Sequence, residues 1–170
     1  MTMPNNNSRI LLQRLKKTLS ELGEAQARLN KIVKIIADSM NSEVCSIYLI
    51  NRYNILELYA TEGLRSKAVH YSQLNVGQGL VGKIAATAEP IKTSQASKTK
   101  GFRYLPETGE EIYNSFLGVP IQRLGKILGV LVIQNLKKRE FTEDDVYGLE
   151  IVAMVIAEMA ELGIFTSSDG

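Results

Sequence analysis

The clearest apolar runs between polar breaks lie in the last third of the chain. Residues 115–122 and 126–135 are rich in β-branched and other apolar side chains, as in half-buried strands. Gly125 lies between them and predicts a hairpin turn. Thr142 precedes Asp145 by three positions, which is the spacing of a capping box at the start of a helix. We therefore expect a β-hairpin followed by a long C-terminal helix.

Apolar residues also repeat at spacings of three and four near the beginning of the chain. The repeat runs from Leu12 to Ile36 and is interrupted by Gln26, close to Gly23. This spacing predicts one amphipathic helix with a heptad seam. The helix either packs on its own domain or pairs with a second chain as a dimerising, signalling helix. The length of the seam favours pairing, because it exceeds that of an average globular helix.

The central part of the chain predicts short strands and one short helix. Residues 43–51 and 55–61 alternate as a hairpin, and residues 69–74 and 91–93 suit two shorter strands. Residues 82–88 predict a short helix, because Glu and Pro follow directly. With the C-terminal hairpin, these segments predict a mainly antiparallel sheet of about six strands.

The order of elements predicts an α/β (α+β) fold with two covering layers. The N- and C-terminal helices are expected on one face of the sheet and residues 77–111, with short helices and loops, on the other. We divide the chain into an N-terminal heptad helix (1–29), a sensory domain (30–162) and a linker to a downstream region (163–170).

Composition narrows the class of protein. The chain has 170 residues and a net charge of +2, with scattered Lys and Arg, so nothing points to nucleic acid. No apolar run approaches the roughly 20 residues of a membrane span, and the first residues lack the apolar core of a secretory signal. We expect a cytoplasmic protein without a membrane or nucleic-acid partner.

Catalytic and metal-binding constellations are missing from the sequence. Cys45 and His70 are the single cysteine and the single histidine, so no catalytic residues and no metal site are expected. Cys45 lies in mid-strand and suits a small buried apolar residue, and His70 suits an exposed strand edge. Residues 77–82 match GxGxxG without the surrounding βαβ unit, so we expect a turn that opens a helix, with Gly82 permitting close packing.

The segment 95–111 has little periodicity and several breakers, together with aromatic, basic and acidic side chains. A loop of this kind is either a lid over a small polar ligand or a loop that its aromatic residues anchor to the domain. Strand alternation adds polar residues from the sheet. The candidate ligand-binding residues are Ser46, Tyr48, Phe102, Tyr104, Glu107, Glu111 and Ser115.

Several motifs together resemble a GAF domain over about residues 30–162. They are Cys45-Ser-Ile-Tyr-Leu49, Gly77-Gln-Gly-Leu-Val-Gly82, Leu117-Gly-Val-Pro-Ile121, Gly129-Val-Leu131 and Phe141-Thr-Glu-Asp-Asp145. Residues 101–111, leading into 115–120, resemble more specifically the N-terminal GAF domain of nitrogen-type phosphoenolpyruvate–protein phosphotransferases, the enzymes I of the nitrogen phosphotransferase system.

This resemblance implies a non-catalytic domain that senses a small molecule, with glutamine as a ligand that reports nitrogen status. The domain would control autophosphorylation of a downstream phosphotransferase and would form a homodimer through its N- and C-terminal helices. No cofactor is expected in the chain itself. The catalytic region, its Mg²⁺ and its phosphocarrier protein partner would belong to the full-length enzyme beyond residue 170.

Two alternatives stay open: a dimerisation or protein-docking module without a ligand, and a cyclic-nucleotide-binding GAF domain. Cyclic-nucleotide-binding GAF domains have the sequence pattern Asn-Lys followed by Phe-x-x-x-Asp-Glu. Here Asn135 precedes Leu136, and Phe141 leads to Asp145 and then Val146, so half of the pattern is present.

Overall fold

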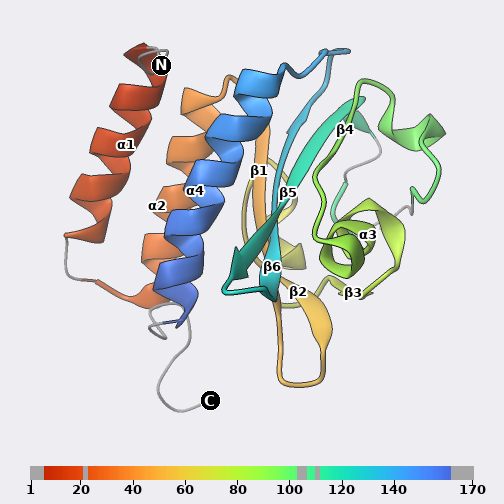
Figure 1. Ribbon diagram of the computed structural model, residues 1–170, viewed down its shortest axis with the longest axis horizontal. Helices are drawn as coiled ribbons and strands as arrows, with labels where there is room; N and C mark the ends of the chain where they lie inside the picture. The colour runs from red at the N-terminus through yellow and green to blue at the C-terminus, as the bar shows by residue number, and fades with distance from the viewer. Residues whose placement is uncertain (1–5, 21–22, 103–106, 110–111, 162–170) are drawn as a thin grey trace.

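The computed structural model describes residues 6–20, 23–102, 107–109 and 112–161 (Figure 1). One antiparallel sheet of six strands has the spatial order β3-β2-β1-β6-β5-β4. The strands are β1 (Val44–Ile50), β2 (Ile55–Glu62), β3 (Gln73–Asn75), β4 (Ile91–Thr93), β5 (Ser115–Arg123) and β6 (Lys126–Asn135). The expected α+β architecture is confirmed.

Helices cover both faces of the sheet, with the longer ones together (Figure 1). One face carries α2 (Ala25–Ser39) and α4 (Glu143–Glu161), with α1 (Asn6–Leu19) packed against α2, and the other carries α3 (Gly79–Thr87). Two short 3₁₀ helices, η1 (Ser66–Ala68) and η2 (Ala96–Lys98), lie in the connections. In the described part of the chain, no helix is long and apolar enough to cross a membrane.

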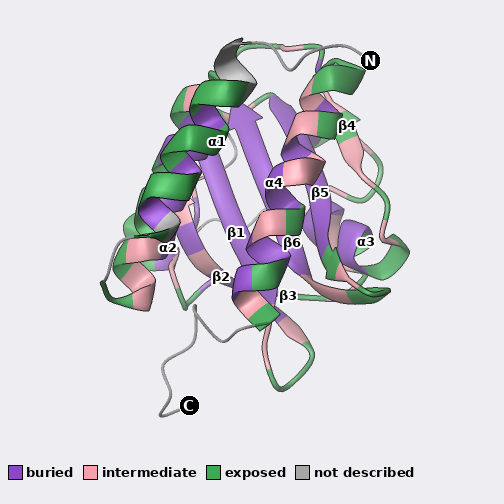
Figure 2. Ribbon diagram, turned by 60° about the vertical axis from the view of Figure 1, so that its left-hand side comes forward, coloured by how far each residue is buried: buried purple, intermediate pink, exposed green. Residues whose placement is uncertain are grey.

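The sheet separates two apolar cores, because successive side chains of a strand point to opposite faces. Cys45, Ile47 and Leu49 of β1 pack under α2 and α4, whereas Tyr48 packs on the α3 side. The central strands are buried on both faces (Figure 2).

The N-terminal segment differs from the single helix that its apolar repeat predicts. The structure has two helices, α1 and α2, which lie side by side and run in opposite directions (Figure 1). The Ser20 hydroxyl donates to the carbonyl oxygens of Lys16 and Lys17, at 3.1 and 2.8 Å, and so competes with helix continuation. Gly23 lies three residues further along the chain, and glycine is unfavourable in the interior of a helix. The expected domain boundary between residues 29 and 30 falls inside α2.

The predicted start of α4 is confirmed in detail. The amide of Asp145 donates to Thr142 Oγ1 at 3.1 Å, and the amide of Thr142 donates to Asp145 Oδ2 at 2.9 Å. These two bonds form a reciprocal capping box, which satisfies amides that the first turn of a helix leaves unpaired.

The GxGxxG segment also behaves as expected. Gly79 is the first residue of α3, and a Cβ added at Gly82 would lie 2.6 Å from the carbonyl oxygen of Asn75. The glycine at position 82 therefore lets α3 approach the end of β3. This is a packing role and needs no nucleotide.

Candidate functional site

The α3 side of the sheet carries buried polar side chains among apolar ones. Ser46 and Thr61 face each other across β1 and β2, and their hydroxyl oxygens are 2.9 Å apart. Ser46 is fully buried, and Tyr48 lies two residues further along the same face. The structure thus brings together two of the expected site residues, Ser46 and Tyr48, on the face that α3 covers.

Gln134 of β6 lies on this face as well, and the sequence analysis missed it. It pairs with Val44 of β1 and Phe116 of β5, and only 4% of its surface is exposed. Its side-chain amide makes no hydrogen bond to any residue that the structure describes, and part of it remains accessible to water. Its position follows from alternation with Val130 and Val132 once the face of β6 is known. We call Ser46, Thr61 and Gln134 the polar floor.

A cover lies over the α3 side of the sheet; we use this name for residues 94–102, 107–109 and 112–114. Phe102 packs against the same apolar core as α3. Glu107 accepts a hydrogen bond from the Ser72 hydroxyl at 3.0 Å, and the Thr108 carbonyl accepts one from the Arg65 amide at 3.1 Å. Phe102 and Glu107 therefore belong to the expected cover. Tyr104 and Glu111 lie outside the described residues.

Tyr113 fixes the last part of the cover to the end of β2. Its hydroxyl donates to the carbonyl oxygen of Gly63 at 3.2 Å. Burial, and secondly the Glu43 carboxylate, raise the pKa of Tyr113 above its usual range. The phenol therefore stays protonated at neutral pH and can keep donating this bond.

Ser115 does not share the site with the other expected residues, which corrects the sequence analysis. It is the first residue of β5 and lies on the face of the helical layer, as does Leu117, because alternation places Phe116 on the α3 side. Its hydroxyl donates to the carbonyl oxygen of Lys137 at 2.6 Å and accepts from the Arg139 amide at 2.6 Å. Ser115 anchors the connection between β6 and α4.

Asn135 and Asp145, which match half of the cyclic-nucleotide pattern, make contacts within the domain. The Asn135 amide nitrogen donates to the Asn41 carbonyl oxygen at 2.8 Å and to Glu43 Oε2 at 2.9 Å. Asp145 caps α4 and lies 3.6 Å from Arg139. Asn135 holds the connection that follows α2, and Asp145 holds the start of α4, so their presence does not indicate a cyclic nucleotide.

The single cysteine and the single histidine both make structural contacts. Cys45 is fully buried, as expected, and burial, with a smaller contribution from Glu62, raises the pKa of its thiol. His70 contacts Glu57 and Gln26, neither of which is a nucleophile. No group of three or more His, Cys, Asp and Glu that could hold a metal occurs among the residues described.

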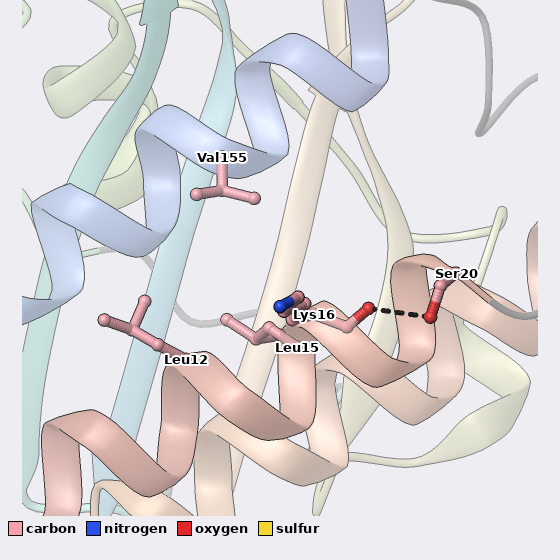
Figure 3. Close-up of a pocket in the computed structure, with 5 residues that line it drawn as sticks. All are labelled: Leu12, Leu15, Lys16, Ser20 and Val155. Carbon is pink, nitrogen blue, oxygen red and sulfur yellow. Dashed lines mark hydrogen bonds between the residues drawn. The ribbon is translucent and has the colours of Figure 1, made fainter.

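A separate groove lies between α1 and α4 on the opposite side of the molecule (Figure 3). Its volume is about 350 Å³, and it is lined by Leu12, Leu15, Lys16, Ser20 and Val155. The predicted seam residue Leu12 is 41% exposed there. Leu12 therefore adds exposed apolar surface to the groove.

Comparisons with known proteins agree with this architecture. Residues 24–159 match the family model of the GAF domain. A protein of the phosphoenolpyruvate-dependent phosphotransferase system of Escherichia coli strain K12 is 33% identical over 165 residues, which is 94% of this chain and 22% of the relative. A Nif-specific regulatory protein of Azospirillum lipoferum is 26% identical over 166 residues, which is 93% of this chain and 26% of the relative.

A solved structure gives the same assignment. The crystal structure of the GAF domain from the Acinetobacter phosphoenolpyruvate-protein phosphotransferase superposes with a TM-score of 0.85 at 33% identity, covering 98% of this chain and 99% of that one. The chain spans only 22% and 26% of the two curated relatives above, so it corresponds to one region of them. The chain therefore belongs to the GAF domain family, and its homologues include the GAF domains of phosphoenolpyruvate-protein phosphotransferases.

Proposed function

We propose that this GAF domain binds a small polar molecule between the polar floor and the cover, and that occupancy regulates a phosphoenolpyruvate–protein phosphotransferase. The observation that carries the proposal is Gln134, a polar residue only 4% exposed among apolar neighbours on the α3 face, whose side-chain amide makes no hydrogen bond to the described residues. A polar side chain placed among apolar ones, with unused hydrogen-bonding capacity, is the kind of group that fixes a small ligand in a mostly apolar site.

The chemistry of the polar floor favours a ligand that carries a primary amide. A primary amide both donates and accepts hydrogen bonds, and two such groups can pair side by side through two bonds. The Ser46 and Thr61 hydroxyls can also donate or accept. Glutamine supplies a carboxamide of this kind, and it suits a domain whose relatives include a Nif-specific regulatory protein. We therefore propose glutamine as the ligand.

Binding can regulate a distant reaction only if the ligand prefers one arrangement of the domain over another. A ligand between floor and cover would stabilise the closed arrangement of the cover. The same preference would then bias how α2 and α4 sit on the sheet. In the full-length enzyme, which we place in the cytoplasm, this bias would set the rate of autophosphorylation by a separate catalytic region that uses Mg²⁺ and passes phosphate to a phosphocarrier protein.

The experiment measures binding by isothermal calorimetry with glutamine, and with glutamate as the charged analogue. We expect saturable glutamine binding and weaker glutamate binding. Replacing Gln134 with Leu removes the proposed partner and should weaken binding at least about tenfold, since losing a buried two-point hydrogen bond costs more than 1.4 kcal/mol. The matched control is Gln122→Leu, at an exposed position of β5. If Gln134→Leu binds glutamine as the wild type does, Gln134 is not a ligand contact.

A second function, dimerisation through the helical layer, is favoured by the groove between α1 and α4. Met154 is 65% exposed beside the groove residue Val155, so apolar surface continues along α4. Leu12→Glu should reduce the mass measured by light scattering from dimer to monomer. Tyr53→Glu, at an exposed hairpin turn, is the control. A dimer that survives Leu12→Glu would exclude this groove as the interface.

A further inference from the structure

The segment 65–72 contacts elements on both sides of the sheet. It leaves the end of β2, forms η1, and returns alongside β2 before β3 begins. The Leu58 amide donates to the Ser72 carbonyl oxygen at 3.0 Å, and the His70 amide donates to the Leu58 carbonyl oxygen at 2.7 Å. Ala68 and Ser72 are fully buried. Residues 65–72 are therefore well packed on β2. One set of their contacts reaches the cover, and a second set reaches the start of α2.

Its first set of contacts holds the cover. The Arg65 amide donates to the Thr108 carbonyl oxygen at 3.1 Å, and the Ser72 hydroxyl donates to Glu107 Oε1 at 3.0 Å. Thr108 is 1% exposed, so this stretch of the cover is buried against the segment. A displacement of residues 107–109 must stretch or break these two bonds.

Its second set of contacts holds the start of α2 through His70. The Nε2 atom of His70 lies 2.7 Å from Gln26 Oε1, and the Nδ1 atom lies 2.8 Å from Glu57 Oε2. Gln26 is oriented for this contact, because its Nε2 donates to the Tyr59 carbonyl oxygen at 2.8 Å. The imidazole also meets the Tyr59 ring edge-on, with ring centroids 4.9 Å apart. The side chain of His70 is thus held from three directions.

The backbone of His70 is strained as well. Its φ is +63°, in the left-handed region that residues other than Gly adopt uncommonly, His, Asn and Asp more often than the rest. Such strain persists only where surrounding contacts determine the conformation, and it is frequent at switch regions. The contacts of His70 with α2 and of Ser72 with the cover lie two residues apart in one short segment.

We propose that residues 65–72 couple the cover to the first turns of α2, with His70 as the positioning residue of this coupling. Displacing residues 107–109 shifts Ser72, which moves His70 and loosens Gln26 at the start of α2. The coupling gives the proposed sensing function a route from the ligand side to the helical layer, and in that sense it rests on that function. Its test uses the protein without ligand, so its failure leaves glutamine binding untouched.

The test is hydrogen exchange of the α2 amides in the full chain, measured for Ser72→Ala and Glu107→Gln. Exchange reports the local opening of an element. Either substitution should speed exchange in residues 28–33 at least about threefold relative to α4, whose amides serve as the reference for global stability. The matched control is Thr99→Ala, which removes a cover hydroxyl whose bonds to described residues go to Thr93 and Gln95. It should leave α2 unchanged.

A double substitution separates coupling from general loosening. His70→Asn keeps a residue that tolerates positive φ but shortens the side chain away from Gln26. If the coupling runs through His70, adding Ser72→Ala to His70→Asn should produce no further change in α2 exchange, because interacting sites are not additive. Unchanged α2 exchange in both cover variants, or full additivity with His70→Asn, would overturn the proposal.

Discussion

Replacing Gln134 with Leu should stabilise the empty domain, although most substitutions of buried residues destabilise. Gln134 is 4% exposed and its amide has no hydrogen bond to the described residues. An unpaired amide in a largely apolar setting costs roughly 1–3 kcal/mol, and Leu has a similar volume. Because part of the amide is accessible to water, we use the lower end of this range of costs. The free energy of unfolding of Gln134→Leu should therefore rise by about 1 kcal/mol.

For a chain of this size, about 1 kcal/mol corresponds to a rise in Tm of roughly 2–4 °C. Urea unfolding followed by circular dichroism should show a higher midpoint with an unchanged slope, which identifies a change in stability alone. The gain in stability should accompany the loss of glutamine binding. That combination is the signature of a polar group kept for function at the expense of stability.

Asn135, the next residue, is the matched control because its amide is fully engaged. It donates to the Asn41 carbonyl oxygen and to Glu43, and its oxygen accepts from Ser42 and Arg139. Asn135→Leu should lower the free energy of unfolding by about 3 kcal/mol, since it leaves several partners unpaired. If Gln134→Leu instead destabilises by more than about 1 kcal/mol, Gln134 has a structural partner and the reasoning about the polar floor is refuted.

Three further substitutions or reactions test the fold. Thr142→Ala should cost about 1 kcal/mol in urea unfolding through loss of its bond to the Asp145 amide, and an unchanged midpoint would contradict this. Cys45 should react with an aromatic disulfide at pH 8 only as fast as the domain unfolds, because burial raises the pKa of its thiol; rapid reaction of the native protein would argue against that burial. Gly129→Ala should destabilise by about 3 kcal/mol, because a Cβ there would overlap the Tyr48 carbonyl oxygen, and a near-wild-type Tm would be incompatible with that packing.

The sequence was most informative where local chemistry decides the structure. The capping box of Thr142 and Asp145 and the hairpin around Gly125 depend on neighbouring residues, and both appear as predicted. The N-terminal helix was predicted wrongly as continuous. The spacings of three and four continue past Gly23 because α1 and α2 each bury one apolar face. Such a periodicity does not show that the chain reverses its direction between two helices.

The candidate site was predictable in part. Alternation along β1 placed Ser46 and Tyr48 on one face, and that face proved to be the one under α3. The same alternation could not assign Ser115, because β5 is apolar on both sides and its register against β6 is a tertiary property. Gln134 was missed for a related reason: a polar residue at the end of an apolar strand signals a site only once its burial is known.

The central claim is that the α3 face of the sheet binds a small molecule, and an amide NMR titration with glutamine tests it most directly. We expect the largest shifts at Ser46, at Thr61 and at the side-chain amide of Gln134, which are the groups that form the polar floor. Smaller shifts should follow in the first turns of α2. No shift at millimolar glutamine, or shifts confined to the groove between α1 and α4, would contradict the account.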